Sequence, residues 1–138
     1  GTTRGVVVRT KDHVLFERGS DEIRAEGRET LELVADLFAA FSGNLEVQGH
    51  TDNIPIRGSR FASNLELSAA RASVVLRHLI EVHGAERSRL HVAGYADTRP
   101  VASMVTEAGR AKNRRVELLF EYPDESPDET PSFDPPSQ

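Results

Sequence analysis

The sequence predicts an α+β fold, with a mixed four-stranded sheet and helices packed on one face. Four short segments, within 5–16, 45–49, 89–95 and 113–121, alternate apolar and polar residues as half-buried strands do. Two longer segments between them carry apolar residues at helical spacing. The order β-α-β-α-β-β favours helices on one face of the sheet, and the polar strand positions predict a solvated opposite face. A length of 138 residues is enough for one hydrophobic core.

The N-terminal region is expected to form the first strand and the first helix. Residues 5–9 and 13–16 are interpreted as one interrupted strand, or as a hairpin around Lys11-Asp12. Ser20 or Asp21 is expected to cap the helix that follows. The apolar residues of this helix have the spacing of one buried face, at Leu31, Val34, Ala35, Phe38 and Phe41.

The stretch from Leu45 to Arg71 carries the densest set of polar motifs. Its strand ends at Gly49-His50-Thr51-Asp52, and a loop rich in turn residues follows. Ser63-Asn64-Leu65-Glu66 has the pattern of a capping box and predicts a helix from about Ser63 to Val82. The apolar residues expected on or near its buried face are Leu67, Val75, Leu76, Leu79 and Val82.

This arrangement brings a carboxylate at a strand end, Asp52, towards a guanidinium near a helix start, Arg71. An anion and a cation held apart by a loop are suited to a ligand that carries both charges. Residues 89–95 then form a strand, a short helix is expected near Val105, and the last strand opens at Asn113. Because Arg114 and Arg115 are neighbours on that strand, only one of them is expected to face a ligand.

The acidic charge of the chain is concentrated at its C-terminal end. The net charge is -5, and five carboxylates follow Tyr122 without any Lys or Arg. The other charged residues are 17 acidic and 17 basic, so no nucleic-acid ligand is expected. Five of the seven prolines also follow Tyr122. We therefore expect a folded domain over 1–122 and a disordered, acidic, proline-rich tail over 123–138.

Four motifs in this order resemble those of the OmpA/MotB family of peptidoglycan-binding domains. They are GHTDNIPI at 49–56, SNLELSAARA at 63–72, GYADTRPV at 94–101 and NRRVEL at 113–118. The long loop with Ile-Pro-Ile resembles MotB-type flagellar stator proteins more than OmpA or Pal. Leu65 departs from this subgroup, which often has Trp at that position.

The resemblance implies an OmpA-like fold and a ligand, the diaminopimelate of the peptidoglycan stem peptide, bound without catalysis or cofactor. The free end of diaminopimelate is a zwitterion, so Asp52 would accept from its ammonium while Arg71 forks onto its carboxylate. By the same motifs, Arg114 is a further ligand-facing residue, and Thr51 and Asn64 supply neutral hydrogen-bonding groups.

The resemblance also implies a larger assembly. Stator-type relatives act as dimers, lie in the periplasm and anchor an ion-driven motor to the wall. The chain starts with Gly-Thr-Thr, and we expect a preceding membrane segment that contacts a MotA-like subunit. An outer-membrane anchor of the OmpA or Pal type and a secretion-system component are the alternatives within the family.

The residues alone leave other roles open. Asp52 can form an Asx turn with Arg71 as its structural partner, Asn64 can cap the helix, and His50 can fix the strand end. A zinc-dependent wall hydrolase would need His50, Asp52 and His91 together, but the sequence has no His-Glu-x-x-His motif.

A dimerising interaction module without a wall ligand also fits the composition and the pattern. Such a module has no need of an unpaired Asp52 and Arg71. For a wall anchor, we expect these two side chains to be unpaired and open to a ligand.

Overall fold

The computed structural model describes residues 5–123 and confirms the mixed four-stranded sheet. The strands are β1 (Gly5–Lys11), β2 (Asn44–His50), β3 (Leu90–Ala96) and β4 (Arg115–Glu121), in the spatial order β1-β4-β2-β3. β4 runs antiparallel to both of its neighbours, and β2 and β3 are parallel. The last strand of the chain therefore lies inside the sheet, where it joins the N-terminal strand to the rest.

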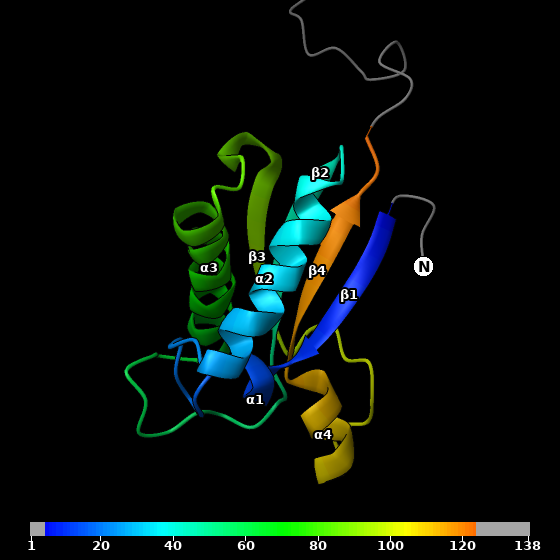
Figure 1. Ribbon diagram of the computed structural model, residues 1–138. Helices are drawn as coiled ribbons and strands as arrows, with labels where there is room; N and C mark the ends of the chain where they lie inside the picture. The colour runs from blue at the N-terminus through cyan, green and yellow to red at the C-terminus, as the bar shows by residue number, and fades with distance from the viewer. Residues whose placement is uncertain (1–4, 124–138) are drawn as a thin grey trace, which may run out of the picture.

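Two long helices cover one face of this sheet. They are α2 (Ala25–Ala39) and α3 (Asn64–His83), which lie side by side over the strands (Figure 1). The shorter elements are α1 (Asp12–Leu15), the 3-10 turn η1 (Arg87–Arg89) and α4 (Glu107–Asn113), and α4 lies beyond the end of β4 (Figure 1). Within residues 5–123, no helix is long and apolar enough to cross a membrane.

The hydrophobic core lies between α2, α3 and the sheet. The alternation predicted for the strands is confirmed on the helix-facing side of β2 and β4, because Leu45, Val47 and Leu118 are fully buried. In the edge strand β3 it is not, since Val92 is 39% exposed. The predicted helix faces are also buried, at Leu31, Val34, Phe38, Leu67, Val75 and Leu79. Val82 was expected on the buried face but is 62% exposed. The next residue, His83, lies on the side of α3 that faces α2, where it lines a pocket together with residues of that helix.

Two glycines allow α3 to approach the sheet closely. A Cβ at Gly49 in β2 would overlap the carbonyl oxygen of Ser68, and one at Gly94 in β3 would lie 2.7 Å from the amide nitrogen of Ala69. The first two turns of α3 are thereby held against the ends of β2 and β3. These turns carry two of the predicted site residues, Asn64 and Arg71.

The segment between β1 and α2 differs from the sequence prediction. Residues 12–15 form the helical turn α1 rather than a strand, and Phe16 then makes an isolated bridge with Ile23. α2 begins at Ala25 without a side-chain cap, while Ser20 accepts a hydrogen bond from the Glu22 amide. In this conformation Leu15 and Phe16 are both buried. A hairpin at the edge of the sheet would bury only one of them, because neighbouring residues of a strand point to opposite faces.

The sheet face opposite the helices is polar, but the prediction that it is solvated is wrong at one end. Gln48, His50, Arg115 and Glu117 are only 3–7% exposed. The ring of Tyr95 stacks on His50 with centroids 5.2 Å apart, and Arg99 lies 3.8 Å from the centre of the Tyr95 ring. Tyr95 of β3 and Arg99 in the segment after β3 therefore cover this end of the sheet, where the polar groups also pair with one another.

The folded part predicted over 1–122 contains all the described elements. The predicted tail over 123–138 lies outside the described residues except for Pro123.

Candidate ligand-binding site

The predicted site residues gather where β2 ends and β4 begins. His50 at the end of β2 is the register partner of Arg115 at the start of β4, and Arg115 is also the partner of Lys11 at the end of β1. Antiparallel pairing places the end of one strand beside the start of the next. The residues just beyond these three strand ends, Asp12, Asp52 and Arg114, therefore meet at one edge of the sheet.

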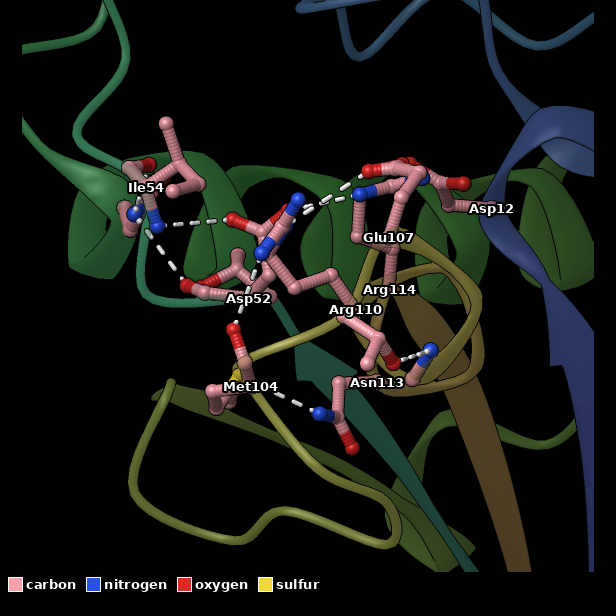
Figure 2. Close-up of polar contacts among 12 residues, drawn as sticks. Asp12, Asp52, Ile54, Met104, Glu107, Arg110, Asn113 and Arg114 are labelled. Atoms are coloured by element: carbon pink, nitrogen blue, oxygen red, sulfur yellow. Dashed lines mark hydrogen bonds and ion pairs between the residues drawn. The ribbon is translucent and has the colours of Figure 1, made fainter.

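Asp52 is held by contacts on both carboxylate oxygens. Its Oδ1 accepts a hydrogen bond of 2.9 Å from the Ile54 amide, which is the Asx turn considered from the sequence. Its Oδ2 accepts one of 2.6 Å from Nη1 of Arg114 (Figure 2). Asp52 is 7% exposed, so its charge is fixed in position by the loop and by one arginine.

Arg114 connects Asp52 with a second carboxylate. Its Nη2 donates to Oε1 of Glu107, at 2.8 Å, in the first turn of α4 (Figure 2). Burial alone would lower the pKa of Arg114, but the hydrogen bonds to Glu107 and Asp52 raise it. The hydrogen bond from Arg114 also lowers the pKa of Glu107. Two carboxylates share this guanidinium, and Glu107 also pairs with Arg110, whose Nε lies 3.5 Å from its Oε2, so the charges of the subsite balance.

Arg71 has a different counter-ion from the one expected. Its Nη1 donates to Oδ2 of Asp12 at 3.0 Å, and the two side chains are 6% and 16% exposed. Its other contacts are hydrogen bonds to the carbonyl oxygens of Ser20 and Glu17 and the ring of Phe16. Burial lowers the pKa of Arg71, and the charge of Asp12 opposes this shift.

The expectation that Asp52 and Arg71 are unpaired and open is therefore wrong. Each has an internal partner of opposite charge, because Arg114 and Asp12 lie at the same sheet edge. Arg71 is not the structural partner of Asp52 either. It ties α3 to α1 and to the segment before α2.

Thr51 and Asn64 hold the loop around Asp52. The Thr51 hydroxyl donates to the carbonyl of Asp52 at 2.8 Å, and its amide donates to the carbonyl of Ala96. The Asn64 side chain donates to the carbonyl of Ile54 at 2.9 Å. The cap of α3 is Ser63, which accepts from the Leu65 amide, so the helix-cap interpretation of Asn64 is wrong.

Two carboxylates of this site were missed by sequence reasoning. Glu107 follows Thr106, which caps α4 by accepting from the Gly109 amide, so a capping pattern could have located it. Asp12 gave no such signal. It lies 59 positions from Arg71, and only the pairing of β1 with β4 brings the two side chains together.

The zinc alternative lacks its geometry. His91 pairs with Glu46 near the start of β2, whereas His50 lies at the end of that strand. Nε2 of His91 lies 3.2 Å from Glu121 and 3.4 Å from Glu46. Throughout residues 5–123, no group of three His, Asp or Glu side chains could hold a metal ion.

His50 was expected to fix the loop through backbone groups, but its hydrogen bond goes to a side chain, and its Nδ1 has no partner within residues 5–123. Its Nε2 lies 3.0 Å from the side-chain oxygen of Gln48, whose amide nitrogen donates to Glu46. Burial, with a contribution from the charge of Arg115, lowers the pKa of His50 to about 4. The imidazole is therefore neutral at pH 7.

A profile of the OmpA family matches residues 15–114, which include Asp52, Arg71 and Arg114. This chain belongs to the OmpA family. All four motifs noted in the sequence lie within or at the end of the matched region.

Curated relatives of this OmpA-family chain include motility and outer-membrane proteins. Motility protein B of Bacillus subtilis (strain 168) is 38% identical over 120 residues, covering 86% of this chain and 46% of that protein. Outer membrane porin F of Pseudomonas fluorescens is 39% identical over 116 residues, covering 83% and 34%. The chain thus spans half or less of the length of these relatives.

Solved structures similar to this OmpA-family domain include a wall anchor and a motility protein. The cell wall anchor of the T6SS from Pseudomonas aeruginosa is 38% identical with a TM-score of 0.79, covering 85% of this chain and 81% of that one. The periplasmic domain of Helicobacter pylori MotB is 29% identical with a TM-score of 0.82, covering 91% and 88%.

Proposed function

We propose that this domain binds peptidoglycan through the diaminopimelate of the stem peptide, without catalysis and without a cofactor. The observation that carries the proposal is the set of charges at one sheet edge, where the ion pair of Asp52 and Arg114 and that of Asp12 and Arg71 lie at neighbouring strand ends. Membership of the OmpA family and the similarity to a cell wall anchor support it.

In this proposal, the ligand ammonium binds at Asp52. A carboxylate oxygen can accept more than one hydrogen bond, so each oxygen of Asp52 keeps acceptor capacity beside its present partner. The negative charge of the Asp52 carboxylate attracts the ligand ammonium. Thr51 and Asn64 contribute by holding the loop that fixes Asp52.

The carboxyl end of the ligand is assigned to Arg71. Arginine has five N–H donors, and Arg71 uses three of them, towards Asp12, Ser20 and Glu17. The remaining donors are available to a ligand oxygen. Arg71 therefore has two roles here, as a tie between α3 and the segment after β1 and as a ligand contact.

At the level of the whole protein, we propose a MotB-like stator component in the periplasm, as a homodimer, with a MotA-like membrane subunit as its partner. The similarity to Motility protein B and to the MotB periplasmic domain favours this assignment. The similarity to Outer membrane porin F favours the second candidate, an outer-membrane wall anchor of the OmpA type. Both candidates use the same wall-binding site.

The test is calorimetric titration with a muropeptide that contains meso-diaminopimelate, together with co-sedimentation on insoluble peptidoglycan. Asp52→Asn keeps an oxygen for the Ile54 amide but loses the charge that holds the ammonium. Because a hydrogen bond to a charged group contributes about 1.5–3 kcal/mol, we expect a loss of about 10- to 100-fold in affinity.

The matched control is Asp36→Asn, which removes an exposed carboxylate from α2 and should leave the affinity unchanged. Urea unfolding of each variant verifies the fold. Wild-type affinity in a folded Asp52→Asn variant would contradict the assignment of the ammonium to Asp52. A folded wild-type protein that binds no muropeptide at millimolar concentration would leave the interaction-module alternative.

A further inference from the structure

In the ion pair of Asp12 and Arg71, the carboxylate is more exposed to solvent than the guanidinium. The Asp12 side chain is 16% exposed and that of Arg71 is 6% exposed. Oδ2 of Asp12 contacts Arg71, whereas Oδ1 forms no hydrogen bond within the described part of the chain. A ligand group that arrives at Arg71 therefore also meets an unoccupied carboxylate oxygen, which can only accept hydrogen bonds.

A free carboxylate is a poor match for this position. It has no donor to offer to Oδ1 of Asp12, and like charges at close range repel. Displacement of Asp12 would separate two largely buried charges that neutralise one another. A carboxamide fits instead, because its NH2 can donate to Asp12 while its carbonyl oxygen accepts from Arg71.

The other carboxylates around the site have arginine partners of their own. Asp52 pairs with Arg114, Glu107 with both Arg114 and Arg110, and Asp21 with Arg60. Asp12, Asp52 and Glu107 thus face three guanidiniums, so the charges of the site balance. The preference for an uncharged carboxyl derivative therefore follows from the local geometry of Asp12 beside Arg71 and not from the net charge of the site.

We propose that Asp12 is a specificity-determining residue. It makes the site prefer diaminopimelate in which the carboxyl group outside the peptide chain is an amide over diaminopimelate in which this group is a carboxylate. This inference rests on the proposed binding of the stem peptide. It adds the chemical form of the ligand and a residue that discriminates between the two forms.

The experiment is calorimetric titration of the wild-type protein with two synthetic stem tripeptides that differ only in a free or amidated carboxyl group on diaminopimelate. We expect the amidated peptide to bind about tenfold more tightly. Asp12→Asn replaces the acceptor-only carboxylate by an amide that can also donate. In this variant we expect the preference to disappear or to reverse, through tighter binding of the free-carboxylate peptide.

Asp36→Asn is the matched control and should keep the wild-type ratio of the two affinities. Binding of both peptides with equal affinity, or tighter binding of the carboxylate form, would overturn the inference and leave the proposed function intact. Absence of binding for both peptides would contradict the proposed function itself. The ratio of the two affinities in the wild type tests the preference even if Asp12→Asn fails to fold. If Asp12→Asn folds and keeps this ratio, Asp12 is excluded as the residue that causes the preference.

Discussion

His50 is a buried imidazole that has no role in the proposed ligand contacts. It is 3% exposed, and its Nδ1 has no hydrogen-bond partner within residues 5–123. Protonation in the folded state would bury a cation and place it near Arg115, so burial first and the charge of Arg115 second lower the pKa of His50 to about 4.

This lowered pKa predicts a loss of stability in acid. Between pH 6.5 and pH 4 the unfolded chain binds a proton at His50 that the folded protein does not bind. The free energy of unfolding should therefore fall as the pH decreases through this window, by at most about 3 kcal/mol from this residue. His50→Gln lacks this contribution, so its stability relative to wild type should rise between pH 7 and pH 4 in urea unfolding.

His91→Gln is the control, because the His91 side chain is 46% exposed. This variant should keep the steeper wild-type dependence in the same pH window. If the wild type and His50→Gln gave parallel curves, the neutral buried state of His50 would be excluded.

At the residue scale, local sequence explains Asp52 but not Arg71. The Asx turn of Asp52 and the turn residues after it are local features, and the sequence suggested them. The partner of Arg71 depends on β1 and β4 being neighbours, which a periodic pattern does not encode. The internal pairing of the site charges could therefore only be seen in the folded structure.

The start of α3 determines the positions of Asn64 and Arg71. Ser63 caps this helix through the Leu65 amide and also contacts Glu66 in the first turn. Ser63→Ala should lower the free energy of unfolding by about 1 kcal/mol, since an N-cap side chain contributes roughly that amount. Because the first turn would fray, we also expect weaker muropeptide binding, measured by calorimetry beside urea unfolding.

Ser88→Ala is the matched control, since the Ser88 side chain is exposed and lies outside the long helices. It should change neither the stability nor the affinity measurably. Equal effects of the two substitutions would mean that the cap of α3 is not what holds the site residues.

At the scale of elements, α3 was predictable at both ends and α2 at neither, because α2 ends at Ala39, before Phe41 and before the expected stop at Gly43-Asn44. The capping box starts α3, and Gly84, with φ of 68°, ends it in the left-handed conformation that glycine favours. Before α2, the candidate cap Ser20 serves a turn instead. A short apolar run such as 14–16 does not distinguish a strand from a buried helical turn, so α1 was missed.

At the scale of the whole molecule, the described residues 5–123 contain the sheet, the core and the candidate site. We therefore predict that a chain ending at Pro123 keeps the stability and the muropeptide affinity of the full chain. Its free energy of unfolding in urea and its muropeptide affinity should equal those of the full 138 residues. Tyr122 must be retained, because its ring packs 6.2 Å from that of Phe41.

A chain ending at Leu118 is the contrasting variant, since it removes the last three residues of β4. It should be strongly destabilised, because Phe120 belongs to the core. A clear loss of affinity on removal of 124–138 alone would show that those residues take part in binding.

The sheet also determines how the domain would bear mechanical load. Gly5 and Glu121 are register partners at one end of β1 and β4, whereas Lys11 and Arg115 are partners at the other end, next to Asp12 and Arg114. The two strands lie side by side along their length (Figure 1). Tension between the N-terminal end of β1 and a ligand held at the site runs along the strands. The seven register pairs of β1 and β4 then share the force in shear, whereas tension across the strands would peel them apart one pair at a time. In the proposed role of a wall anchor, load applied between these two ends would meet the sheet in this shear geometry.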